Sequence, residues 1–295
     1  MGIDVQAIRV LVDLSKKKSL GKVITLGRQN LSLSNFEKKK LSRKYNIKLS
    51  LLEEEWAEPL LLEHFKAESI DSVDNSKFEG ATIIHDLNTL IDDEYANAYD
   101  TVLDFGTSEH IYNIKAVVDN LVKLTKVAGH VVHIVPSNNM CGHGFYQFSP
   151  MFYTQIYSRK NGFTLNFLAI AKIKSIDKWY KVVDLAGMDR YVFYNQYPST
   201  IIVIATKETL PSLNLAAIQQ PDYATQWITE EKTDVNPSNV RFLKWIKKLL
   251  LSNNQVKFVN TLVAIYLVFR PFHGYADYLN RIKNFKSINE NDPLL

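Results

Sequence analysis

Segments with the pattern of buried β-strands alternate with segments of helical spacing along the first two thirds of the chain. Three such pairs are KVITL at 22–26 before a helix over 33–45, YDTVLDFG at 99–106 before a helix over 114–127, and HVVHIVP at 130–136 before a helix over 150–160. Strands that alternate with helices of about a dozen residues are typical of a parallel sheet covered by helices on both faces. The alternation therefore predicts a Rossmann-like, doubly wound α/β fold.

Further elements are expected around these pairs. A helix over 3–14 leads into the first strand, and Ser69–Asp74 and ATIIHDLN at 81–88 have the composition of a second and a third strand. Two late strands are expected at 163–173 and 200–206. About 26 residues without an obvious long helix separate them, which suits an antiparallel last strand in a mostly parallel sheet.

The chain of 295 residues, 46% of them hydrophobic, is long enough for one α/β domain with an extension. A stretch with three prolines and many polar residues follows the last expected strand and reads as a linker. The sequence thus predicts a Rossmann-like domain over 1–210, a linker over 211–239, and a basic helical C-terminal extension over 240–295.

The charge is unevenly distributed. Residues 237–286 contain nine basic residues and one acid, so this region carries a charge of +8. Because the whole chain has a formal net charge of +4, the remainder carries −4. The net charge is too small to indicate nucleic-acid binding. Within the basic region, 240–251 alternates basic and apolar residues at helical spacing around Trp245. Two interpretations remain open: a helix at a membrane surface, or a terminal helix packed on the domain with its lysines in water.

One cysteine, Cys141, excludes an intrachain disulfide and a thiolate metal cluster, and a reducing cytoplasm is the expected setting. The N-terminus reads as an amphipathic helix and not as a secretion signal. The most apolar stretch, 256–269, spans about 14 residues, short of the roughly 20 that cross a bilayer. We therefore expect a cytoplasmic protein without a transmembrane helix, and at most peripheral membrane contact through its basic region.

Three long blocks lie where strands are expected to end: SVDNSKFEGATIIHDLN at 72–88, YDTVLDFGTSEHIYN at 99–113 and GHGFYQFSP at 142–150. With the flanking strands, they resemble class I S-adenosylmethionine-dependent methyltransferase-like proteins, in particular a group associated with surface-polysaccharide gene clusters. The resemblance covers roughly residues 20–207. It implies S-adenosylmethionine as cofactor and methyl transfer to an oxygen or nitrogen of a small or glycan-linked acceptor.

The resemblance also implies roles for residues at three strand ends. Asp74 would accept the two ribose hydroxyls, with Asp71 as the second choice, because a carboxylate can accept both. Asp86 would accept from the adenine amino group, and the backbone N–H of Leu87 would meet the ring. The end of the fourth strand would line the methionine part of the cofactor with Asp104, Phe105 and Gly106. Each aspartate could instead cap a turn.

The loop after the first strand departs from the family pattern. The family has two or three glycines there, whereas GRQNLS retains only Gly27 and places Arg28 and Gln29 where bulk should obstruct the cofactor. Three explanations remain: the loop takes another path, Arg28 binds the cofactor carboxylate or another anion, or cofactor binding has been lost. Two rival functions follow, a non-catalytic binding or scaffold protein and a nucleotide-sugar-using transferase with Arg28 on a phosphate.

Candidate catalytic residues follow the fourth and fifth strands. His143, in a glycine-flanked turn beside an aromatic run that includes Tyr146, is the expected general base, with His110 and Tyr146 as alternatives. Glu109, His110 and His143 could also converge with Asp104 on a metal ion. Adjacent residues of a regular helix point apart, so no metal site is expected. His133, within the fifth strand, is expected to be a core or strand-surface residue.

Overall fold

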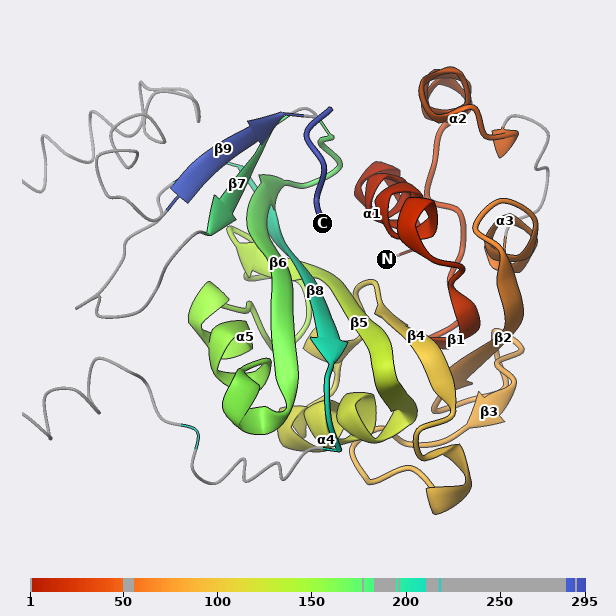
Figure 1. Ribbon diagram of the computed structural model, residues 1–295, viewed down its shortest axis with the longest axis vertical. Coiled ribbons are helices and arrows are strands. Elements are labelled where there is room, and N and C mark those ends of the chain that lie inside the picture. Colours follow the sequence, from red (N-terminus) through yellow and green to blue (C-terminus); the bar gives the residue numbers. More distant parts are fainter. Residues whose placement is uncertain are drawn as a thin grey trace, which may run out of the picture.

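A computed structural model describes residues 2–49, 56–176, 178–182, 195, 197–210, 218, 285–289 and 291–295. The helices in this part of the chain are α1 (Val5–Lys17), α2 (Asn35–Tyr45), α3 (Glu58–Glu63), α4 (Ile114–Leu124) and α5 (Pro150–Ile156), with short 3₁₀ turns at Asp93–Tyr95, Ser108–His110 and Arg159–Asn161. The strands are β1 (Gly21–Leu26), β2 (Ala67–Asp74), β3 (Ile83–Ile84), β4 (Tyr99–Asp104), β5 (Thr125–Asn138), β6 (Phe163–Lys172), β7 (Lys178–Val182), β8 (Ser199–Lys207) and β9 (Phe285–Asn289). They form one sheet (Figure 1).

The strand order is β3-β2-β1-β4-β5-β8-β6-β7-β9. The first five strands in this order are mutually parallel, and β8 lies antiparallel between β5 and β6. This arrangement confirms the expected Rossmann-like, mostly parallel sheet with an antiparallel late strand. Since the chain runs outward from β1 to β3 and then restarts at β4, the sheet has a topological switch point between β1 and β4, where open α/β sheets bind ligands.

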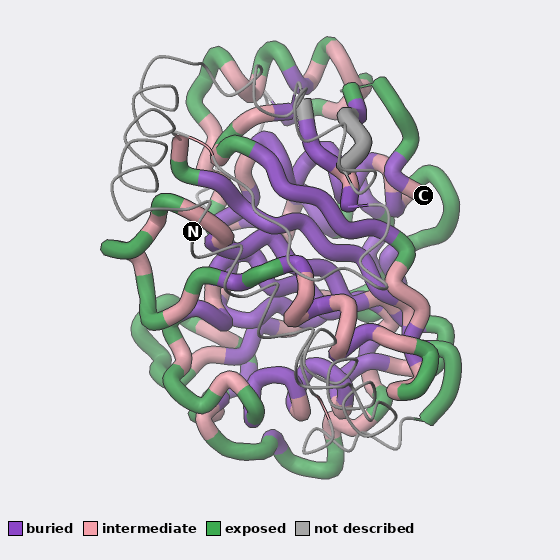
Figure 2. The backbone as a smooth tube through the Cα atoms, turned by 90° about the vertical axis from the view of Figure 1, so that its left-hand side faces the viewer, coloured by how far each residue is buried: buried purple, intermediate pink, exposed green. Residues whose placement is uncertain are grey.

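The two faces of the sheet are covered by different helices (Figure 1). Successive side chains of a strand point to opposite faces, so neighbours such as Val102 and Leu103 enter different cores. One core contains α4 and α5, and the other contains α1, α2 and α3. The strands between them are buried over most of their length (Figure 2), which is why β5 and β8 read as continuous apolar runs.

Three elements differ from the sequence-based expectation. The expected helix over 114–127 ends at Leu124, and β5 begins directly at Thr125, whose hydroxyl donates to the carbonyl of Leu121 at 2.6 Å. The third strand is only two residues long. Strand β7 was not expected from the sequence; it pairs antiparallel with the preceding strand β6 and with β9, about a hundred residues further along the chain.

The expected linker over 211–239 and the basic stretch 240–251 lie outside the described residues, apart from Ile218. The described end of the expected helical extension is not helical: Phe285–Asn289 form β9, antiparallel to β7 at the edge of the sheet. In the described part of the chain, no helix is long and apolar enough to cross a membrane.

The buried Arg9 of α1 joins the two ends of the described chain. Its guanidinium donates to the carbonyls of Ile176 at 2.8 Å and of Asn289 at 2.6 Å, and it lies 4.1 Å from the centre of the Trp179 ring. Backbone carbonyls and an aromatic face thus contribute to satisfying this buried cation. The contact fixes the C-terminal strand against the first helix.

Candidate active site

A cavity of about 200 Å³ lies at the carboxyl ends of the parallel strands, beside the switch point. It is lined by Val73, Asp74, Asn75, His85, Asp86, Leu87, Asn88, Thr107, His110 and Ile111. These residues come from the ends of β2, β3 and β4, which parallel pairing brings to one edge of the sheet. A larger cavity of about 300 Å³ lies between α1, α2 and the C-terminal residues, away from the strand ends, and contains none of the expected site residues.

Asp74 and Asp86 share the cavity at the strand ends. Asp74 is half-buried at the end of β2, and its Oδ1 accepts from the backbone N–H of Ser76 at 3.2 Å. Asp86 follows β3, and its Oδ1 accepts from the backbone and side-chain amides of Asn88 at 3.0 and 2.8 Å. These bonds hold the pKa of Asp86 below its usual range. Among the described residues, neither Oδ2 atom has a hydrogen-bond partner, so each carboxylate combines a turn contact with a free acceptor.

Leu87, expected to offer its backbone N–H, is buried beside Asp86. Within the described part of the chain, this N–H donates to no other group. The next turn is closed instead by the N–H of Thr89, which donates to the carbonyl of Asp86 at 2.9 Å. A free acceptor and a free donor therefore stand side by side after β3.

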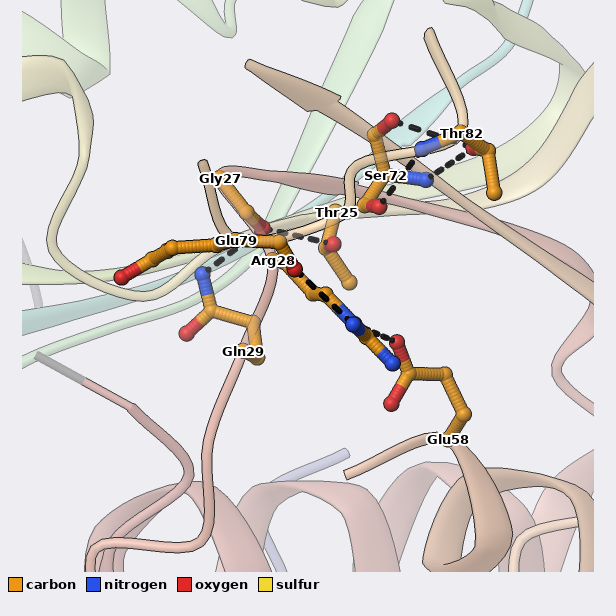
Figure 3. A network of polar contacts seen from close by, with 8 residues as sticks. All are labelled: Thr25, Gly27, Arg28, Gln29, Glu58, Ser72, Glu79 and Thr82. Atoms are coloured by element: carbon orange, nitrogen blue, oxygen red, sulfur yellow. Dashed lines mark hydrogen bonds and ion pairs between the residues drawn. The ribbon is translucent and has the colours of Figure 1, made fainter. Parts of the chain in front are cut away.

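The loop after β1 takes a path that its single glycine permits. Gly27 has φ +66°, and a side chain at this position would place its Cβ 3.0 Å from Thr107 Oγ1 and 3.9 Å from Asp74 Oδ2. The carbonyl of Gly27 accepts from Thr25 Oγ1 at 2.7 Å and from Gln29 Nε2 at 3.2 Å (Figure 3). Gln29 thus folds back to satisfy the turn and does not extend into the cavity.

Arg28 points to the neighbouring elements (Figure 3). Its Nε forms an ion pair with Glu58 Oε1 at 2.7 Å, its Nη1 donates to the carbonyl of Glu79 at 2.8 Å, and its guanidinium lies 4.3 Å from the centre of the Trp56 ring. The chain then continues beside the N-terminus, where the N–H of Ile3 donates to the carbonyl of Asn30 at 2.8 Å. Arg28 and Gln29 thus make their contacts within the protein, and neither lines the cavity at the strand ends.

The end of β4 carries a buried polar pair. Asp104 is fully buried, and its Oδ2 lies 2.7 Å from His133 Nδ1, while its Oδ1 accepts from the N–H groups of Thr107 and Ser108. Burial alone would raise the pKa of Asp104, but the hydrogen bonds outweigh it and the pKa lies below its usual range. His133 also meets the Tyr157 hydroxyl through Nε2 at 2.6 Å. The Asp104 side chain is therefore directed into the core.

Phe105 and Gly106 occupy the turn that follows. Phe105 is buried in the core beneath α1, and Gly106 has φ +91°, a conformation that favours glycine. None of the three residues expected to line the methionine part of a cofactor lines the cavity at the strand ends, whereas the neighbouring Thr107 does. Thr107 was not expected; its hydroxyl donates to the carbonyl of Leu26 at 2.6 Å and joins the ends of β1 and β4.

Glu109, His110 and His143 come together beside the cavity. Oε1 of Glu109 lies 3.4 Å from Nε2 of His143 and 3.7 Å from Nε2 of His110, and the two imidazole rings are 4.9 Å apart at 69°. The Glu109 side chain is 0% exposed, whereas the histidines are partly exposed. Burial, and then the charge of Asp104, raises the pKa of Glu109 to about 8. Burial lowers the pKa of both histidines, which therefore favour the neutral form.

The turn after β5 reaches Glu109 because of Gly144. This glycine has φ +73° and lies so close that a Cβ would come within 2.7 Å of the carbonyl oxygen of Glu109. The N–H of Phe145 donates to that same carbonyl at 2.7 Å. The close approach brings His143 over the Glu109 carboxyl.

The hydroxyl of Tyr146 is already hydrogen-bonded within the protein, because it donates to the carbonyl of Tyr112 at 2.6 Å. Near it, Tyr112 and Phe145 expose 75% and 66% of their surface and lie edge to face, with ring centres 6.0 Å apart. Of the aromatic residues in the turn after β5, Phe145 is thus exposed beside Tyr112, whereas Phe148 is buried in the core.

No protein-family model matches the sequence, and comparison with curated proteins gives no match. Solved structures do resemble it. A protein assigned as a type 11 methyltransferase from Sulfolobus solfataricus is 16% identical, with a TM-score of 0.35 over 68% of this chain and 90% of the other. TehB from Haemophilus influenzae is 14% identical, with a TM-score of 0.38 over 67% and 61%. The trans-methyltransferase CalH in complex with SAH is 12% identical, with a TM-score of 0.37 over 68% and 55%. At these TM-scores, the function has to be derived from the residues of this chain.

Proposed function

We propose that the cavity at the strand ends binds S-adenosylmethionine and that the protein transfers its methyl group to an oxygen or nitrogen of a small or glycan-linked acceptor. The observation that carries the proposal is the meeting of Asp74 and Asp86 in one cavity beside the switch point. Asp74 would accept the ribose hydroxyls through its free Oδ2. Asp86 would accept a hydrogen bond from the adenine edge, and the N–H of Leu87 would donate one to it.

The residues present fit such a ligand. Asp74 offers a carboxylate for a diol, and Asp86 with Leu87 offers an acceptor and a donor for the adenine edge. Gly27 leaves open the space beside Asp74 and Thr107 that a Cβ would fill. The cavity of about 200 Å³ is smaller than a site that encloses a whole drug-sized ligand, so it suits the nucleoside part. The remainder would extend along Gly106 and Thr107. When bound, S-adenosylmethionine supplies a methyl group already activated by its sulfonium.

The chain's own residues would then orient the acceptor and remove its proton. His143, expected from the sequence to be the base, is neutral near pH 7 and keeps Nδ1 free of hydrogen bonds to the described residues, while Nε2 faces Glu109. Because the pKa of Glu109 is about 8, its carboxyl is protonated near pH 7, and it can orient the imidazole through Nε2 while Nδ1 takes up the proton. Phe145 and Tyr112 offer exposed aromatic faces, which stack on sugar rings and thus support a glycan-linked acceptor.

Calorimetric titration with S-adenosylmethionine and S-adenosylhomocysteine tests the binding. Replacing Asp74 by alanine should weaken binding by about 1.5–3 kcal/mol, about 10- to 150-fold, because a charged hydrogen bond is lost. Asp119→Ala, on the exposed side of α4 and paired with Lys115, is the control and should bind as the wild type does. No heat at millimolar ligand would overturn the proposal and favour a non-catalytic role.

The role of His143 is tested once an acceptor has been found by screening. His143→Ala should leave the affinity for S-adenosylhomocysteine nearly unchanged and lower turnover by about 100-fold or more. Turnover at the wild-type level across pH 6 to 8 would remove His143 as the base. Tyr146 would be a poor replacement, because its hydroxyl proton is held by Tyr112.

A further inference from the structure

Glu109, His110 and His143 have the donor atoms of a metal site. One oxygen or nitrogen from each of the three side chains lies within 4.8 Å of the others. Both carboxyl oxygens of Glu109 and Nε2 of His143 are buried and have no hydrogen-bond partner in the described part of the chain. A buried polar group without a partner costs free energy, and Glu109 Oε1 and His143 Nε2 lie only 3.4 Å apart, so these atoms indicate a missing common partner.

The spacing of these atoms fits a small cation. Two bonds of about 2.1 Å at a tetrahedral angle hold two ligand atoms about 3.4 Å apart. The distances from Glu109 Oε1 are 3.4 Å to His143 Nε2 and 3.7 Å to His110 Nε2. Both contacts are thus within a few tenths of an ångström of the required edges. The donor atoms of the two imidazoles lie within 4.8 Å of each other, so the rings have to turn toward each other to complete the third edge.

The local backbone explains how adjacent residues converge. Glu109 and His110 lie in a single 3₁₀ turn that follows β4, and not in a regular helix, so the sequence-based objection that neighbours point apart does not apply. His143 is brought in by the close approach of Gly144 to the Glu109 backbone. Asp104, once considered as a fourth ligand, is bound to His133 and takes no part.

We propose that Glu109, His110 and His143 bind one divalent transition-metal ion of the zinc class. Two imidazoles and one carboxylate, with a further position left open, form a donor set that zinc accepts, whereas magnesium and calcium prefer oxygen ligands alone. On binding, the ion would displace the proton of the Glu109 carboxyl and compensate the negative charge that this leaves. His110 also lines the cavity at the strand ends, so the open position would face an acceptor near the proposed methyl group. An imidazole bound to a metal through Nε2 carries its proton on Nδ1, so His143 could not act as a base while the ion is bound, and the two roles of His143 are alternatives. The metal site itself does not depend on methyl transfer.

The test uses Zn²⁺ alone, without S-adenosylmethionine. The full-length protein is freed of metal with a chelator, the chelator is removed, and Zn²⁺ is titrated in competition with a chromophoric chelator. One ion per chain is expected to bind. Absorption of the Co²⁺-loaded protein reports the number of ligands. Mutation of a residue that only supports a metal ligand weakens metal affinity about 10- to 100-fold. Loss of a ligand itself should therefore weaken Zn²⁺ binding by at least about 100-fold.

The variants are His110→Ala, His143→Ala and Glu109→Gln. The two histidines are partly exposed, so their replacement leaves the core intact and keeps the test valid even where Glu109→Gln perturbs folding. His64→Ala, at the end of α3, is the control and should bind Zn²⁺ as the wild type does. Absence of one-to-one binding, or affinity unchanged in both histidine variants, would overturn the proposal. A protein that binds Zn²⁺ in this pattern but no S-adenosylmethionine would refute only the proposed methyl transfer.

Discussion

The sharpest test of the arrangement around Glu109 is a pair of glycines two residues apart. Gly144 has φ +73°, and a Cβ there would lie 2.7 Å from the carbonyl oxygen and 2.9 Å from Cγ of Glu109. Gly142 has no positive φ, and a Cβ there would meet no atom within 4 Å. Alanine should therefore be harmful at one position and harmless at the other, although both lie in the same exposed turn.

The magnitude follows from two separate effects. A left-handed conformation costs a residue with a Cβ about 1–2 kcal/mol relative to glycine. In addition, the clash is with backbone, which cannot rotate away, so the turn has to move and the hydrogen bond from Phe145 N–H to Glu109, worth about 1 kcal/mol, is weakened. Gly144→Ala should thus lower the free energy of unfolding by about 2–3 kcal/mol. Gly142→Ala should change it by less than about 1 kcal/mol, in the stabilising direction.

Urea unfolding of the two variants and the wild type, followed by circular dichroism, measures these differences. Gly144→Ala should also weaken Zn²⁺ binding, because His143 moves with the turn. Equal stabilities of the two variants would refute the reasoning, since they would show that the turn does not depend on its approach to Glu109.

Two further predictions concern single side chains. Arg28→Ala should lower the free energy of unfolding by only about 1 kcal/mol, because the ion pair of Arg28 with Glu58 is partly exposed. The affinity for S-adenosylhomocysteine, measured by calorimetry, should change less than about threefold. A complete loss of binding would show that Arg28 contacts the ligand. With a chelator present, the melting temperature of Glu109→Gln minus that of the wild type should rise between pH 4.5 and 8. In this window the folded wild type keeps a proton on Glu109, whose pKa is about 8, and the unfolded chain has lost it, so wild-type stability falls as pH rises; a constant difference would contradict the raised pKa.

Local sequence patterns were sufficient to predict the strands whose ends line the cavity. Val102 and Leu103 alternate between two cores, and this requires a strand covered on both faces. Once β2 and β3 are parallel neighbours, their carboxyl ends must lie together, so the meeting of Asp74 and Asp86 could be predicted from the order of elements. The roles given to these two residues remain predictions.

Contacts that depend on register or on distant pairing could not be predicted. Asp104 faces His133 because the two residues are directly paired across β4 and β5, and a shift of two residues would have separated them. His133 was expected only as a core or strand residue, and its bond to Tyr157 gave no signal in the sequence. The prediction for Arg28 rested only on its position in the glycine loop. Its partners Glu58 and Glu79 lie 30 and 51 residues further along the chain, so the contacts could not be predicted from the local sequence.

Strand β9 ties the completion of the sheet to the last residues of the chain. Until residues 285–289 have left the ribosome, β7 has an unpaired edge, and open edges of this kind pair with other chains. Arg9 and Asn289 lie 280 positions apart in the sequence, and a contact that closes so long a loop slows folding. The outer edge of β7 is therefore covered by β9 only once residues 285–289 have been synthesised.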